Sequence, residues 1–178
     1  LTISCSTSIL PADTNGPATA TDNCATRTIN YTDSVVNGTG NNKVITRTWT
    51  ATDANLNTAT YSQTITVTDS TAPTFTTSPA NLTISCSASI LPAATNGPAT
   101  ATDNCATPTI NYSDSVVNGT GNNKVITRTW TATDSNSNTT TYIQTITVTD
   151  TQAPTFITSP ASLTISCSAS ILPANTNG

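Results

Sequence analysis

The chain has 178 residues, and its nine acidic and five basic side chains give a formal net charge of −4. It contains no histidine, which excludes imidazole-based catalytic triads and His-ligated metal sites. The basic residues are scattered and the apolar runs are short, so we expect neither a nucleic-acid interface nor a segment that inserts into a membrane.

The sequence repeats itself with a period of 81 residues. The pentapeptide Leu-Thr-Ile-Ser-Cys begins at positions 1, 82 and 163, and the first two copies differ at only about a dozen positions. This period exceeds that of solenoid repeats and suits a small independent domain. Two Asp-to-Pro segments, 69–73 and 150–154, are predicted linkers, because proline cannot continue a strand ladder. The predicted domains are an N-terminally truncated repeat at 1–69, a complete repeat at 70–150 and the start of a third at 151–178.

In the complete copy, the first predicted strands lie, in chain order, at 82–86, 98–105 and 109–114. Two longer segments follow, 125–133 and 141–149, in which polar and apolar residues alternate with a period of two. The loop at 134–138 between them is rich in Asp, Asn and Ser and predicts a hairpin. Short strands separated by turn signals predict an all-β fold of tandem immunoglobulin-like β-sandwiches.

The predicted core is small for a domain of this size. A sandwich of this size with one Trp and one Phe is only marginally stable without a crosslink. We therefore expect disulfides within each copy, Cys5–Cys24 and Cys86–Cys105, with two separate buried thiols as the alternative; Cys167 would pair beyond the given sequence. Disulfides indicate an oxidising, extracellular setting. The predicted core residues are Leu82, Ile84, Ile90, Leu91, Ile110, Tyr112, Ile126, Trp130, Ile146 and Val148.

Strand directions predict which loops meet. We call the end at which the chain enters a repeat its proximal pole and the end at which it leaves its distal pole. Oxygen-bearing side chains from the linker and two loops should converge at the proximal pole of the second copy, where hard ligands suit Ca²⁺. The loop at 134–138 begins like a calcium-binding loop, yet it lacks the Gly and Glu of an EF-hand, so a plain Asx-rich turn is the alternative. The candidate ligands are Asp69, Asp103, Asp134, Asn136 and Asn138, and in the first copy Asp22, Asp53, Asn55 and Asn57.

Several motifs carry a family resemblance: Ala72–Phe75, Leu82–Cys86, Ala101–Cys105, Arg128–Asp134 and Gln144–Asp150. Together they resemble hyalin-repeat-type (HYR-like) domains, as found in arrays of giant surface adhesins of gliding Bacteroidota such as flavobacteria. The resemblance implies an immunoglobulin-like fold, a spacer or adhesive role in gliding or surface attachment, and export by type IX secretion. Some HYR-like domains look as if they carry four cysteines each. Each copy here has two cysteines, so a second disulfide per domain is not expected.

The expected function is therefore structural or adhesive, as a repeat module of a long extracellular cell-surface filament, and an enzyme is not expected. The expected partners are neighbouring repeats, and beyond them other filament chains or surface polysaccharide. The alternative is a carbohydrate-binding accessory module of a secreted enzyme, which would need exposed aromatic side chains. Three Asp-Ser segments resemble the acceptor pattern of Bacteroidota O-glycosylation, at Ser34, Ser115 and Ser70.

Overall fold

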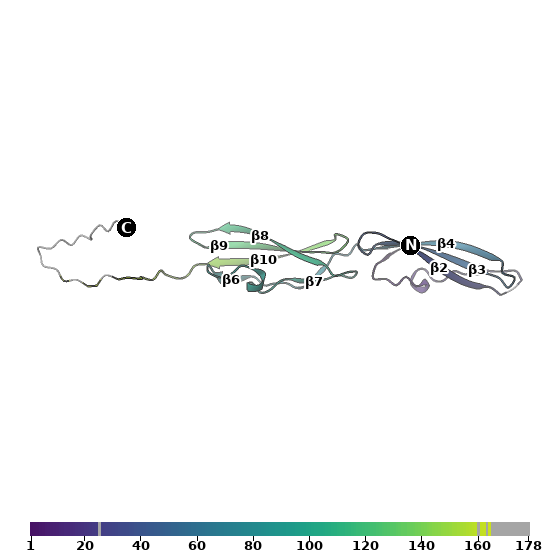
Figure 1. The fold of residues 1–178 in the computed structure, drawn as a ribbon, viewed down its shortest axis with the longest axis horizontal. Coiled ribbons are helices and arrows are strands. Elements are labelled where there is room, and N and C mark those ends of the chain that lie inside the picture. The colour runs from purple at the N-terminus through teal and green to yellow at the C-terminus, as the bar shows by residue number, and fades with distance from the viewer. Residues whose placement is uncertain (25, 160, 163, 165–178) are drawn as a thin grey trace.

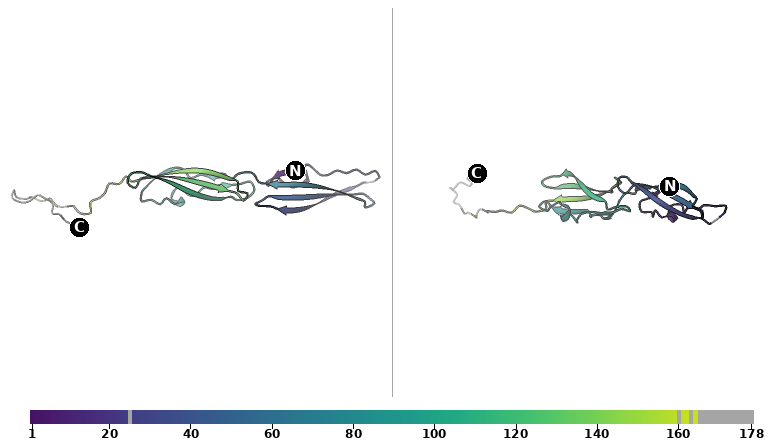
Figure 2. Two further views of the ribbon diagram at one scale, coloured as in Figure 1. Left: turned by 90° about the horizontal axis from the view of Figure 1, so that it is seen from above. Right: turned by 45° about the vertical axis from the view of Figure 1, so that its right-hand side comes forward.

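The computed structural model describes residues 1–24, 26–159, 161–162 and 164 of the chain. It is an all-β structure in which two repeats lie end to end (Figures 1 and 2). Within the described residues the helical elements are the single 3-10 turns Pro11–Asp13 and Pro92–Ala94, and no helix there is long and apolar enough to cross a bilayer.

Each repeat contains a four-stranded sheet, and the two sheets have the same topology. Three long antiparallel strands form a meander, and a short strand adds to the last of them in parallel. The sheet of repeat two has the order β6-β10-β9-β8, and that of repeat one the order β1-β4-β3-β2. The strands of repeat one are β1 (Thr2–Ser4), β2 (Thr28–Asn37), β3 (Lys43–Thr52) and β4 (Thr58–Thr68). Those of repeat two are β6 (Leu82–Ser85), β8 (Thr109–Asn118), β9 (Lys124–Thr133) and β10 (Thr139–Thr149).

A second, two-stranded sheet covers one face of repeat two. It pairs β5 (Thr74–Thr77), which follows the linker directly, with β7 (Thr100–Thr102). The ring of Phe75 on β5 lies 6.1 Å from that of Tyr142 on β10, which closes the second layer over the first. The predicted strand at 98–105 is shorter than expected, whereas the strand predicted at 109–114 continues to Asn118 because its pairing with β9 runs on to Lys124.

The buried face of the long strands is the one predicted from their alternation. Ile126, Trp130 and Ala132 on β9 and Ile146 and Val148 on β10 are all at most 2% exposed. Two of the predicted core residues do not belong to the core: Leu91 is 61% exposed and Tyr112 is 43% exposed. Leu91 precedes the 3-10 turn, and its neighbour Ile90 takes the place against the sheet instead.

A buried arginine completes this face in both repeats. Arg128 on β9 is 1% exposed, and its Nε and Nη2 atoms each donate to a different carboxylate oxygen of Asp114 at 2.8 Å. Its remaining donors reach Thr95 Oγ1 at 3.0 Å and the Ile90 carbonyl at 2.7 Å, while the guanidinium stacks 4.5 Å above the Tyr112 ring. This stacking explains why Tyr112 stays half exposed: it covers the arginine rather than the apolar core.

The counterpart pair in repeat one predicts a loss of stability in acid. A hydrogen bond from Arg47 lowers the pKa of Asp33, although burial opposes the shift. A carboxyl group whose pKa is lower in the folded state stabilises the fold at pH values above its unfolded-state pKa of about 3.9. This stabilisation is lost as the pH falls through the folded-state pKa. We expect the free energy of unfolding, measured with urea, to fall between about pH 4 and pH 2. The Asp33→Asn variant should show a shallower fall, and an identical pH profile would contradict the assignment.

Candidate functional site

The two repeats meet at a polar junction between the distal pole of repeat one and the proximal pole of repeat two. Asn136 is its centre: its Nδ2 donates to Asn42 Oδ1 at 2.6 Å, and its Oδ1 accepts from the Asn41 N–H at 3.3 Å. Asn138 Nδ2 donates to the Asp69 carbonyl at 3.3 Å. These hydrogen bonds join residues 69 or more positions apart in the sequence, so the linker is not the only connection between the repeats.

A glycine permits this close approach. Gly40 has a φ of +61°, and a Cβ atom there would collide with the Asn136 side chain. Its counterpart in repeat two, Gly121, has nearly the same φ of +65° and open space around it. Gly40, Asn41 and Asn42 were not predicted as junction residues. The available signal was the position of their loop, which joins β2 to β3 at the same pole as the linker.

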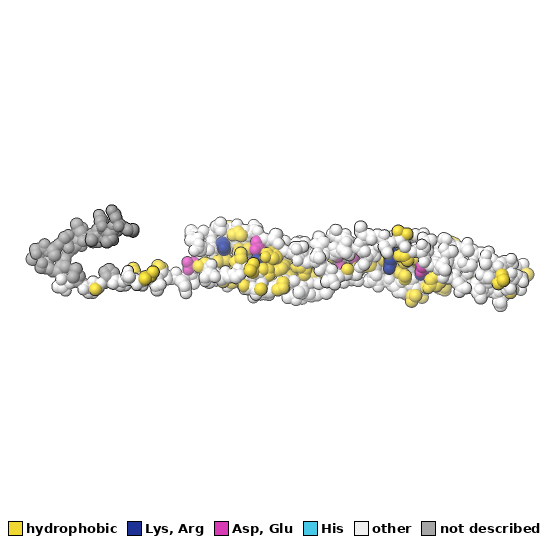
Figure 3. All heavy atoms as spheres, in the orientation of Figure 1, with side chains coloured by type: hydrophobic (Ala, Val, Ile, Leu, Met, Phe, Trp, Pro, Cys, Tyr) yellow, Lys and Arg dark blue, Asp and Glu magenta, His cyan; other side chains and the backbone are white. Residues whose placement is uncertain are grey.

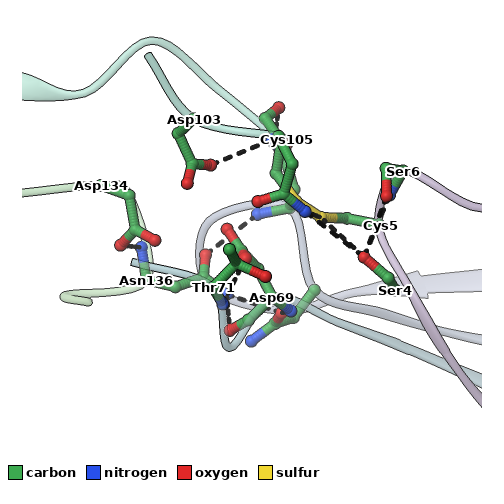
Figure 4. Close-up of a disulfide and its surroundings, with 12 residues drawn as sticks. Ser4, Cys5, Ser6, Asp69, Thr71, Asp103, Cys105, Asp134 and Asn136 are labelled. Atoms are coloured by element: carbon green, nitrogen blue, oxygen red, sulfur yellow. Dashed lines mark hydrogen bonds between the residues drawn. A yellow bond between two sulfur atoms is a disulfide. The ribbon is translucent and has the colours of Figure 1, made fainter. Parts of the chain in front are cut away.

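A disulfide crosslinks the junction, and it is not one of the predicted pairs. Cys5 bonds to Cys105 across 100 residues of sequence, with a Cα–Cα distance of 5.8 Å that is usual for a disulfide (Figure 4). Cys24 and Cys86 are free and exposed. The predicted pairs Cys5–Cys24 and Cys86–Cys105 are therefore wrong, and Cys167 lies outside the described residues.

The strand directions explain why the predicted pairs cannot form. The Cys5 N–H donates to the Thr68 carbonyl at the end of β4, which is the distal pole. The segment that leads to Cys24 lines a pocket with Asn57 and Thr58, where β4 begins, which is the proximal pole. β4 has 11 residues, so at about 3.3 Å per residue the two cysteines of one repeat lie roughly 35 Å apart. Cys5 instead meets Cys105 of the neighbouring repeat.

Three carboxylates converge beside the disulfide. One oxygen each of Asp69, Asp103 and Asp134 lies within 4.8 Å of the others, as predicted from the strand directions (Figure 4). Asp69 comes from the linker after repeat one, whereas the other two come from loops of repeat two. The ion pairs among the described residues are Arg47–Asp33 and Arg128–Asp114, so no basic side chain there neutralises the cluster.

Hydrogen bonds satisfy the carboxylates only in part. Asp134 accepts from the N–H groups of Asn136 and Asn138 and from Asn138 Nδ2, each at 2.8 Å. Burial raises the pKa of Asp134, yet these hydrogen bonds outweigh it and hold the pKa below its usual value. Asp69 Oδ2 and Asp103 Oδ1, by contrast, are buried without a hydrogen-bond partner. Asn136 and Asn138 thus donate hydrogen bonds to Asp134, while Asn136 Oδ1 accepts one from the Asn41 N–H.

At the proximal pole of repeat one, the equivalent loops contact no other repeat among the residues that the structure describes. Asp53 accepts hydrogen bonds from the N–H of Asn55 and from the side chain and N–H of Asn57, chiefly the Asn57 side chain, and its pKa is lowered. Asp22 lines the same pocket. Among the described residues no third carboxylate joins Asp22 and Asp53, because the counterpart of Asp69 would come from a preceding linker.

The three predicted acceptor serines lie on the surface. Ser34 on β2 and Ser115 on β8 are exposed on edge strands, and Ser70 is exposed in the linker. Their hydroxyl groups are accessible, and their glycosylation stays a prediction. No protein-family model and no curated protein matches the chain.

Proposed function

We propose that the chain is a structural spacer: tandem immunoglobulin-like repeats, 81 residues each, that join end to end into a rod. The observation that carries this proposal is the crosslink between repeats, Cys5–Cys105, beside a polar junction. A tether of independent domains needs only a linker, whereas this junction adds a covalent bond and several hydrogen bonds. Such a junction restricts bending between neighbouring domains, which is what a spacer requires.

The repeat supports extension of the same arrangement. Cys86 occupies in repeat two the position of Cys5, and its N–H donates to the Thr149 carbonyl as that of Cys5 does to Thr68. Cys24 occupies in repeat one the position of Cys105. We infer that each free cysteine pairs with a further repeat, so that every junction in an array carries one disulfide.

The surface suits an extracellular array. On the face drawn in Figure 3, charged side chains are few; backbone and uncharged polar side chains make up most of the surface, and hydrophobic side chains gather in a patch on repeat two. Near-identical repeats present the same surface many times, which favours multivalent attachment even where each contact is weak. The Cys5–Cys105 disulfide and the resemblance to gliding-motility adhesins support a place on the cell surface after type IX export. Neighbouring repeats, other filament chains and surface polysaccharide are the corresponding partners.

The alternative of a carbohydrate-binding module rests on exposed aromatic side chains, and Tyr61 is the main candidate at 67% exposed. Its counterpart in repeat two, 81 residues later, is Tyr142. In repeat two, Tyr142 is half-buried because its hydroxyl donates to the Pro79 carbonyl and Phe75 lies against its ring. The described residues of repeat one contain no counterpart of that segment. Tyr61 is therefore exposed because no such segment covers its ring. Its exposure is no sign of a sugar-binding surface, which favours the spacer.

The test is the stiffness of the junction. We expect small-angle scattering of the oxidised chain to show a narrow distribution of angles between the repeats. Gly40→Ala should broaden that distribution, because the new Cβ displaces Asn136. Gly121→Ala is the matched control, since it carries the same backbone strain with nothing nearby. Equal scattering from both variants, or a broad distribution in the parent chain, would overturn the spacer proposal. Binding of a polysaccharide that Tyr61→Ala abolishes would favour the alternative.

A further inference from the structure

We propose that Asp69, Asp103 and Asp134 bind one calcium ion between the two repeats. The cluster places one oxygen of each carboxylate within 4.8 Å of the others, which is close enough for a single cation to contact all three. Hard oxygen ligands in an irregular arrangement suit Ca²⁺, which accepts six to eight oxygens, better than Mg²⁺, which demands octahedral geometry. Water would complete the coordination.

An independent observation points to a ligand. Asp69 is only 7% exposed, and its Oδ2 atom has no hydrogen-bond partner. Asp103 Oδ1 is buried and unpartnered in the same way. Buried carboxylate oxygens are normally paired, because removing them from water is costly. With no basic side chain paired to these carboxylates among the described residues, a cation supplies both the missing contacts and the missing charge.

The other hydrogen bonds leave room for the ion. The Thr71 N–H donates to Asp69 Oδ1, and the Cys105 N–H donates to Asp103 Oδ2, so these two carboxylates are each anchored through one oxygen with the other left over. Both oxygens of Asp134 accept hydrogen bonds from Asn136 or Asn138, and one of them would be shared with the ion. The sulfur atoms of Cys5 and Cys105 also lie near Asp69, but they form the disulfide and so offer no thiolate. The donor set is therefore made of oxygen.

The site requires both repeats, since the linker after repeat one supplies Asp69 and repeat two supplies the rest. At the equivalent pole of repeat one, the carboxylates that the described residues supply are those of Asp22 and Asp53. We therefore expect one calcium ion for each junction between repeats, and not one for each Asx-rich turn. The ion would also resist separation of the repeats, which deepens the proposed spacer function without being required for it.

The test is calorimetric titration of the oxidised full chain with CaCl₂, alongside thermal unfolding in CaCl₂ or EGTA. We expect one ion per chain with a dissociation constant of roughly 0.1–1 mM, as in extracellular calcium modules. Asp134→Asn and Asp69→Asn, one from each repeat, should each weaken binding at least tenfold and abolish the stabilisation by calcium. Asp53→Asn, the repeat-one counterpart of Asp134→Asn, should leave both unchanged.

Two results would overturn the site. One is no saturable binding up to about 10 mM CaCl₂, which is weaker than extracellular modules reach. The other is equal weakening by Asp53→Asn and Asp134→Asn, which would assign the binding to Asx-rich turns in general. Should one substitution unfold the junction, the other, on the opposite repeat, still decides the outcome. A chain that binds no calcium and yet stays stiff in EGTA would exclude the metal site and leave the spacer function intact.

Discussion

Replacing Cys5 and Cys105 together by Ser should lower the free energy of unfolding by about 4 to 5 kcal/mol. The disulfide closes a loop of 100 residues, and the loss of loop-closure entropy in the unfolded chain gives that magnitude. Paired replacement avoids leaving one of these thiols unpaired. The measurement is urea unfolding of the oxidised chain followed by tryptophan fluorescence, since each repeat carries one buried tryptophan, Trp49 or Trp130.

The matched control replaces Cys24 and Cys86, which are free in the structure. This double variant should unfold like the parent chain. Peptide mapping without reduction should recover Cys5 joined to Cys105. Recovery of Cys5 joined to Cys24, together with equal losses in the two double variants, would return the crosslink to the interior of each repeat and remove the main support for a stiff rod.

Trp130→Ala should destabilise repeat two by about 3 to 5 kcal/mol, which is typical for truncation of a buried aromatic side chain. The indole is 2% exposed, its ring lies 5.3 Å from that of Tyr112, and its Nε1 donates to Gln144 Oε1 at 3.4 Å. Truncation would open a cavity beside the buried Arg128 and leave the Gln144 oxygen without this donor. Urea unfolding followed by circular dichroism measures the loss.

Thr147→Ala serves as the control on the opposite face of β10. Thr147 pairs with Val125 and Thr83 across the sheet and is half-buried, so its replacement should cost well under about 1 kcal/mol. Comparable losses from Thr147→Ala and Trp130→Ala would mean that the buried and exposed faces of this strand are assigned incorrectly.

Local patterns predicted the long strands well, because alternation with a period of two reports directly on burial. Ile126, Trp130, Ile146 and Val148 face the core as expected. The same approach did not predict the four hydrogen bonds of the buried Arg128. Two go to Asp114, its cross-strand partner on β8, and the other two go to Thr95 and Ile90, which lie 33 and 38 residues earlier in the chain. A buried charge of this kind is predictable only once its partners are placed.

The junction shows what strand directions can and cannot predict. They brought Asp69, Asp103 and Asp134 together correctly. They also place the two cysteines of one repeat at opposite poles, yet short separation in the sequence favoured Cys5–Cys24 instead. Loop length alone is therefore a weak guide to pairing in a tandem array, because the nearest cysteine in space can belong to the next repeat. The contacts of Asn41 and Asn42 with Asn136 depend on how the distal pole of repeat one packs against the proximal pole of repeat two. The sequence of a single repeat does not reveal this packing.

The Cys5–Cys105 bond also determines how the chain responds to tension. A pull on Leu1 passes through Cys5 and the sulfur bridge directly into Cys105, so residues 6–104 lie in a closed loop that carries no load. At about 3.5 Å per extended residue, roughly 350 Å of chain length is thereby withheld from stretching. Repeat one could unfold completely without lengthening the tether between Cys5 and Cys105, and a protease cut in the linker would leave both halves attached. The bond makes the molecule inextensible in this region even where its folds fail.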